Sequence, residues 1–218
     1  MNPFRIRWAF GAIAATMISL AGTTGFAGFT VSLDRVTPIA SGPNAGDFLW
    51  TYSASIAPTD TITPTGPISP ASTGNHFFEI YDFKGYVAGT ATAPSGWSVS
   101  TPNSSSPPPP ANILLLHGDD PTIPNLVFKY TSGSPIVGVT LPAGTVPGTF
   151  TAVSAYSSPG NVKDFVGQLS RASDGSIVAS GGDILAPVPE PIAMISTGLG
   201  LLLLGVGYAL KSRKPAIA

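Results

Sequence analysis

Two histidines, His76 and His117, are the side chains best suited to acid–base chemistry near neutral pH. A serine hydrolase would pair one of them with a nucleophile elbow of the Gly-x-Ser-x-Gly type, and the sequence contains no such motif. The chain also has no cysteine, which excludes thiol nucleophiles and thiolate metal sites. We therefore assign no catalytic residue and predict that the protein is not an enzyme, with a secreted hydrolase as an alternative.

Two other groups of residues could bind a ligand. Asp119 and Asp120 offer neighbouring carboxylates for Ca²⁺, with Asp164 or Asp174 as further oxygen donors. An Asp-Asp-Pro turn in water explains the same pair, and no EF-hand loop is present. Trp97 follows Gly96 and is a candidate platform for a sugar ring, with packing in the core as its alternative. We assign no metal centre and no cofactor.

The charges are few and unevenly distributed. The chain has 218 residues, with 10 Lys and Arg against 11 Asp and Glu, and its formal net charge is −1. Such a chain has no basic field to neutralise phosphates, so we expect no nucleic-acid partner. Residues 28–190 hold all eleven acids but only five cations, which gives this part a charge of −6. The other five cations lie at the two ends and call for a separate explanation.

The amino end has the build of a secretory signal peptide. Arg5 and Arg7 precede an apolar stretch over residues 8–21. This stretch is shorter than the roughly 20 residues that a membrane-spanning helix needs. We predict a signal helix that is removed during export, which implies the secretion machinery and signal peptidase as partners. An uncleaved anchor and a buried helix are the alternatives.

The cleavage site follows from the small residues that signal peptidase requires. Gly25 and Ala27 occupy the third and first positions before the predicted cut, and Ser19 and Ala21 offer a second choice. We favour cleavage after Ala27, so that residues 1–27 form the signal peptide.

The carboxyl end carries the remaining three cations. Residues 192–210 form an uncharged, leucine-rich run that would reach about 28 Å as a helix, enough to cross a bilayer. Lys211, Arg213 and Lys214 follow and would stop translocation on the cytoplasmic side. We predict one transmembrane helix that leaves the rest of the chain outside.

Val188-Pro189-Glu190-Pro191 stands directly before this run. With it, residues 188–214 resemble the PEP-CTERM sorting signal, in which a Pro-Glu-Pro motif, one apolar span and a basic end are read together. The resemblance implies an exosortase-type membrane enzyme as a partner, Pro189, Glu190 and Pro191 as recognition residues, and Lys211, Arg213 and Lys214 as the basic end. The alternative is a plain stop-transfer anchor with a stiff proline spacer.

The middle of the chain has a periodicity that predicts β-strands. Residues 48–56 alternate strictly, with Trp50 and Tyr52 on the apolar face. Turn-forming residues separate most candidates, and Asp174-Gly175 is the clearest hairpin signal. The other candidate strands are 29–33, 77–83, 86–92, 97–100, 113–116, 126–130, 136–141, 150–156, 165–171 and 176–180. We predict a mainly β, antiparallel β-sandwich or jelly-roll-like domain over 28–180, followed by a linker over 181–187.

The proline-rich segments 58–70 and 101–110 are expected to be extended surface loops. In residues 77–83, which loosely resemble a strand in some other PEP-CTERM proteins, Phe78 and Ile80 should face one core and Phe77, Tyr81 and Phe83 another layer.

The expected function is that of an exported envelope or extracellular-matrix protein, structural or adhesive. A calcium-binding module, or one that binds extracellular polysaccharide, is the alternative.

Overall fold

The computed structural model describes residues 28–68, 72–105, 113–138 and 148–189. The predicted signal peptide (1–27), the predicted span (192–210) and the basic end lie outside the described residues. The described part of the chain contains no helix with the length and apolar character needed to cross a bilayer.

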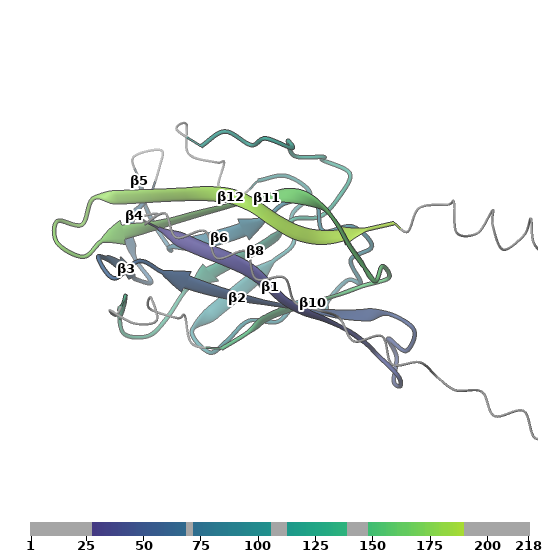
Figure 1. The fold of residues 1–218 in the computed structure, drawn as a ribbon. Coiled ribbons are helices and arrows are strands. Elements are labelled where there is room, and N and C mark those ends of the chain that lie inside the picture. Colours follow the sequence, from purple (N-terminus) through teal and green to yellow (C-terminus); the bar gives the residue numbers. More distant parts are fainter. Residues whose placement is uncertain (1–27, 69–71, 106–112, 139–147, 190–218) are drawn as a thin grey trace, which may run out of the picture.

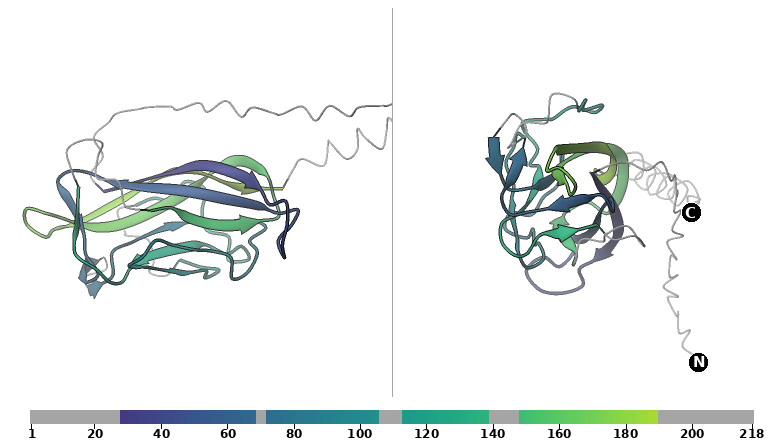
Figure 2. Two further views of the ribbon diagram at one scale, coloured as in Figure 1. Left: turned by 90° about the horizontal axis from the view of Figure 1, so that it is seen from below. Right: turned by 90° about the vertical axis from the view of Figure 1, so that its left-hand side faces the viewer.

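The body is mainly β, with antiparallel sheets in a sandwich-like arrangement (Figure 1). The smaller sheet has the order β1-β2-β10, and strands run along the length of the body (Figure 2). Its strands are β1 (Phe29–Pro38), β2 (Phe48–Ile56) and β10 (Phe150–Ser154).

The larger sheet has the order β7-β8-β6-β11-β3-β9, and β12 pairs with β11 beside this path. Its strands are β3 (Asp60–Ile62), β6 (Phe77–Ile80), β7 (Trp97–Ser100), β8 (Leu126–Tyr130), β9 (Ile136–Val137), β11 (Ser158–Arg171) and β12 (Ile177–Val188). A separate two-stranded sheet contains β4 (Gly66–Ile68) and β5 (Ser72–Gly74).

The long β11–β12 hairpin confirms the predicted turn at Asp174-Gly175 and corrects the predicted linker. Pairing runs in one register from Ser170↔Ile177 past the two glycines to Val162↔Leu185, and after a bulge between Val162 and Gly160 it ends at Ser158↔Val188. Residues 181–187 are therefore part of β12, and the linker prediction was wrong. Ile184 and Ala186 alternate into the interior and are buried, which explains why the strand continues.

The core lies between the two sheets and is rich in aromatic side chains. On the apolar face of β2, Trp50 and Tyr52 are fully buried as predicted, and Phe48 at the start of the strand is partly buried. The Phe78 ring of β6 packs edge-on against the Phe150 ring of β10, with centroids 4.7 Å apart. Trp97 is 9% exposed and lies 5.1 Å from the same Phe150 ring, so it is a core residue rather than an exposed sugar platform.

Several local predictions differ from the structure. Segment 58–70 was expected to lack regular structure, yet it contains β3 and β4, because Pro58 and Pro64 lie outside the strands and Pro67 lies in the small two-stranded sheet. Residues 86–92 form no strand, and they pair with β10 through two isolated bridges, Tyr86↔Ser154 and Thr92↔Thr151. Residues 113–116 form no strand, and Leu114 and Leu116 point outward with 79% and 70% exposure.

The strand over 77–83 also departs from its expected pattern. Phe78 and Ile80 face the main core as predicted, but Phe83 joins them there. The cause is Asp82, which has a φ of 51° and interrupts the alternation of the extended chain. Phe77 and Tyr81 are buried outside that cluster.

Candidate functional site

The candidate site lies on the β11–β12 hairpin, where two carboxylates meet a histidine. Asp164 of β11 is paired directly with Asp183 of β12. One ligand atom each of His117, Asp164 and Asp183 lies within 4.8 Å of the others, the one such group among the described residues. Like charges directly opposite each other in a sheet are destabilising, so a bound cation would relieve the repulsion between the two carboxylates.

Asp164 also fixes the loop that follows residue 112. Its Oδ1 accepts the Leu116 N–H at 3.2 Å, and its Oδ2 accepts the His117 N–H at 2.7 Å. The His117 Nδ1 lies 3.3 Å from Oδ1. Asp164 is buried while His117 and Asp183 are exposed. A mixed set of one imidazole and two carboxylates suits a transition metal better than Ca²⁺, which prefers oxygen ligands throughout.

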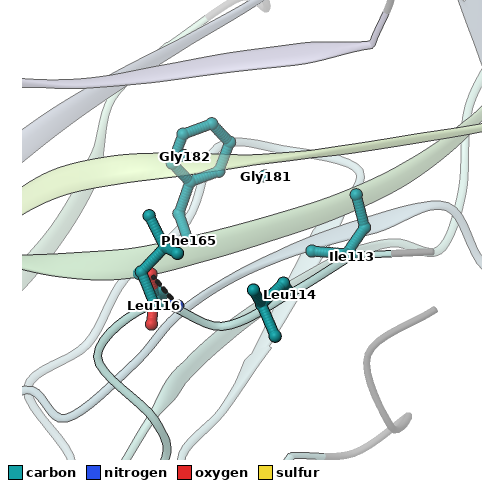
Figure 3. Close-up of a pocket in the computed structure, with 7 residues that line it drawn as sticks. Ile113, Leu114, Leu116, Phe165, Gly181 and Gly182 are labelled. Atoms are coloured by element: carbon teal, nitrogen blue, oxygen red, sulfur yellow. Dashed lines mark hydrogen bonds between the residues drawn. The ribbon is translucent and has the colours of Figure 1, made fainter. Parts of the chain in front are cut away.

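An apolar groove adjoins these residues (Figure 3). Its volume is about 230 Å³, and Ile113, Leu114, Leu116, Asp164, Phe165, Gly181 and Gly182 line it. A second hollow of about 390 Å³ shares four of these residues and continues to Phe29, Thr30 and Val31 of β1. The glycines permit this close approach, since a Cβ on Gly181 would lie 2.9 Å from Ile113 Cγ2. The sequence analysis did not foresee the groove.

The carboxylates of Asp119 and Asp120 were predicted as a calcium pair. Instead, they accept hydrogen bonds from nearby loop residues. Asp119 accepts hydrogen bonds from the Ser105 N–H at 3.1 Å and from Asn125 Nδ2 at 3.1 Å. Asp120 accepts from the Thr122 N–H at 3.0 Å and the Thr122 hydroxyl at 2.7 Å. Hydrogen bonds from Thr122 lower the pKa of the Asp120 carboxyl.

Asp174 is used in the same way. It accepts the Ser176 N–H at 2.9 Å in the β11–β12 turn. Within the described ranges, the structure does not bring Asp119, Asp120 or Asp174 into a shared ligand group. Of the residues considered for calcium, only Asp164 lies in the candidate site.

A buried acid next to β8 was missed by the sequence analysis. Glu79 is fully buried in β6, and its Oε1 accepts a hydrogen bond from Asn125 Nδ2 at 3.0 Å. Burial raises the pKa of Glu79 to about 8, and the nearby Asp119 carboxylate adds to the rise, so the side chain is mostly neutral at pH 7. The sequence feature that could have indicated this buried acid is a single glutamate between the apolar residues Phe78 and Ile80.

Asp82 connects this region to β11. Its Oδ2 pairs with Lys163 Nζ at 2.7 Å, and its Oδ1 accepts the Asp120 N–H at 2.9 Å. The Asp82 N–H donates to Asn125 Oδ1 at 2.9 Å. Both carboxyl oxygens and the backbone N–H of Asp82 therefore take part in structural contacts.

His76 contacts a serine, but the hydrogen bonds have the wrong direction for a general base. Nδ1 accepts the Thr63 N–H at 2.8 Å, so the proton of the neutral ring lies on Nε2, which faces Ser170 Oγ at 3.0 Å. His76 is fully buried and Ser170 is 4% exposed, and a Cβ on Gly66 would collide with the ring. Burial lowers the pKa of His76 to about 4. The pair lies in the interior rather than in a cleft.

The predicted sorting motif begins where the described body ends. Val188 is the last residue of β12 and pairs with Ser158. Pro189 follows outside any strand. Glu190, Pro191, Lys211, Arg213 and Lys214 lie outside the described residues, and so does Ala27 at the predicted signal cleavage site.

The chain matches no protein-family model, no curated protein and no solved structure. Its function is therefore inferred from its own residues.

Proposed function

We propose that this chain is an exported bacterial protein of the cell envelope or extracellular matrix, sorted by its carboxyl-terminal signal, with a structural or adhesive and non-catalytic body. The observation that carries the proposal is the order of features over residues 188–214. Val188-Pro189-Glu190-Pro191 is followed at once by the uncharged run 192–210 and by three cations. The signal peptide features over residues 1–27 support the same route.

The end of β12 supports a motif held at the membrane surface. Because β12 continues to Val188, almost no spacer separates the paired hairpin from Pro189. Each proline fixes φ near −65° and lacks an N–H, so Pro189 and Pro191 favour an extended, accessible segment. Glu190 would stay hydrated at that level. The processing partner is then an exosortase-type enzyme, with signal peptidase acting at the other end.

The body supports a scaffold role. We infer that it is a true β-sandwich, since aromatic side chains of β6 and β10 interlock between the sheets. The two histidines serve structural contacts, His76 with Thr63 and His117 with Asp164. Extracellular polysaccharide is a fitting partner for such a body at the cell surface.

A test replaces Pro189, Glu190 and Pro191 by alanine in the native host. We expect the wild-type body to be cut and released from its membrane segment, while the variant stays membrane-anchored at full carboxyl-terminal length. Asp183→Asn is the control, because it removes a nearby carboxylate of β12 without touching the motif. Release of the triple-alanine variant at the wild-type rate would contradict the sorting proposal.

The groove favours a ligand-binding module as the second candidate function. Its lining joins the exposed Leu114 and Leu116 to Asp164, a member of the candidate ligand group. The test compares thermal unfolding with Zn²⁺, with Ca²⁺ and with a chelator, and measures retention on the host's polysaccharide. Stabilisation or retention that Asp183→Asn abolishes would support binding, and no effect in either experiment would argue against it.

A further inference from the structure

The backbone nitrogen of Gly28 makes a contact that is unusual for the start of a strand. Gly28 precedes β1, and its nitrogen donates to Asp60 Oδ2 at 2.6 Å. Asp60 lies in β3 and is fully buried. The Gly28 nitrogen is therefore fixed to a carboxylate inside the body.

This carboxylate has no cationic partner in the described part of the chain. Its other oxygen accepts a hydrogen bond from Thr59 Oγ1 at 3.2 Å. The ion pairs of the described residues join His117 to Asp164 and Lys163 to Asp82. Arg171 is paired with Asp60 in the β11–β3 register, but its side chain is exposed and forms no ion pair with it. A buried carboxylate is expected to have a positive partner, because desolvation of an unpaired charge is costly.

We propose that removal of the signal peptide supplies this partner: cleavage of the Ala27–Gly28 bond leaves an amino-terminal ammonium on Gly28 that forms a buried ion pair with Asp60. The proposal rests on the signal peptide of the proposed function. In the cleavage, water adds across the peptide bond, its hydroxyl going to the Ala27 carbonyl carbon and a hydrogen to the Gly28 nitrogen. The released amine takes a further proton from solvent at neutral pH.

The surroundings of Gly28 require a glycine and fix the position of its nitrogen. Its φ is 106°, and a Cβ would lie 2.6 Å from Ser180 Cβ, so a residue with a side chain does not fit. Ser180 Oγ accepts the Phe29 N–H at 2.9 Å, and the Gly28 carbonyl accepts the Ala57 N–H at 3.4 Å. These contacts hold the Gly28 nitrogen in place opposite Asp60, with β12 on one side and the end of β2 on the other.

The ion pair makes export and folding stability dependent on each other. Before cleavage the Gly28 nitrogen is a neutral amide, which offers Asp60 one hydrogen bond. After cleavage the same atom carries a full positive charge, and charge-assisted hydrogen bonds are about twice as strong as neutral ones. The mature body is therefore more stable than the precursor, and the contact with Asp60 accounts for this difference in folding stability.

The first experiment measures the reactivity of the Gly28 amine. The full chain is exported from a bacterial host that lacks an exosortase and purified in detergent, and mass spectrometry identifies its first residue. Reductive methylation of the folded chain should modify Gly28 at least about tenfold more slowly than in urea, as a pairing free energy of about 1.4 kcal/mol produces. Asp60→Asn should remove the protection, and the charge-matched Asp47→Asn should keep it.

The second experiment separates the ion pair from the neutral hydrogen bond. Ala27→Phe puts a large side chain where signal peptidase requires a small one and keeps the leader attached. In the cleaved chain, Asp60→Asn should lower the unfolding midpoint by about 5–10 °C. In the uncleaved Ala27→Phe chain, the same substitution should lower it by less than half as much.

Two results would overturn the inference and leave the export proposal intact. One is a mature chain that begins at residue 22, after the alternative site at Ala21. The other is a chain that begins at Gly28 but whose amine reacts equally fast folded and unfolded. A chain that stays in the cytosol with its leader would instead refute the export proposal together with this inference.

Discussion

Glu79 and Asn125 form a hydrogen bond of 3.0 Å between two fully buried side chains, Nδ2 of Asn125 donating to Oε1 of Glu79. A glutamate in this position resembles the buried acids that catalysis employs. Here it is enclosed by β6 and the start of β8, and Asn125 also contacts Asp82 and Asp119. We interpret Glu79 as a neutral structural acid that helps to hold the loop before β8.

Glu79→Gln tests this interpretation. The pKa of Glu79 rises from 4.5 to about 8 on folding, so the folded state holds the proton more tightly. The stabilisation is complete below pH 4.5 and is lost as the pH rises towards 8. Between pH 5 and pH 8 we expect the wild type to lose about 2–4 kcal/mol that Glu79→Gln does not lose.

Urea unfolding at several pH values, followed by tryptophan fluorescence, measures this difference. Asp174→Asn is the control, since it alters an exposed carboxyl in the β11–β12 turn. An unchanged pH slope in Glu79→Gln would refute the neutral-acid interpretation.

His76 gives a pH dependence of the opposite sign. Its pKa falls from 6.5 to about 4 on folding because burial disfavours the charged ring. The stability from the neutral ring is complete above pH 6.5 and is lost as the pH falls towards 4, by about 2–3 kcal/mol. His76→Asn should be less stable at pH 7 and should lack this loss, whereas the exposed-site variant His117→Gln should retain it. Equal acid sensitivity in His76→Asn would show that another group is responsible.

The aromatic core should respond strongly to a cavity at its centre. Phe78 contacts the rings of Phe29, Trp97, Phe128 and Phe150. Phe78→Ala should lower the free energy of unfolding by about 3–5 kcal/mol in a urea titration. Leu114→Ala, at a side chain that is 79% exposed, should change it by less than about 0.5 kcal/mol. Similar effects of the two substitutions would contradict the described core.

The ion pair between Asp82 and Lys163 is a further test of the described packing. Asp82 Oδ2 and Lys163 Nζ lie 2.7 Å apart, with side-chain exposures of 2% and 16%. Lys163→Met should cost about 3 kcal/mol, because it leaves a buried carboxylate unpaired. Asp82→Asn in the same chain should recover part of that loss, since it removes the charge. If the double variant is no more stable than Lys163→Met, the pairing does not account for the cost.

Strict alternation made some of the fold predictable. The strands 48–56, 97–100 and 126–130 have the predicted bounds, because their side chains alternate between interior and surface or lie in an apolar run between turn residues. Asp174-Gly175 likewise marked the hairpin. These are local signals that do not depend on distant parts of the chain.

The failures came from contacts between distant segments. Gly181 and Gly182 suggested a linker, yet they are strand residues that leave room for Ile113 and Phe165. The pairing of Asp164 with Asp183 depends on one hairpin register that holds from Ser170↔Ile177 to Val162↔Leu185, which the expected linker over 181–187 did not include. No spacing in the sequence indicates that His117 joins them.

The central claim concerns the two ends of the mature chain, and intact-mass analysis of the protein from its native envelope tests it most directly. We predict a species that starts at Gly28 and lacks the run 192–210 with its basic end. A mature protein that retains its carboxyl terminus through Ala218 would contradict the sorting proposal and favour a plain membrane anchor.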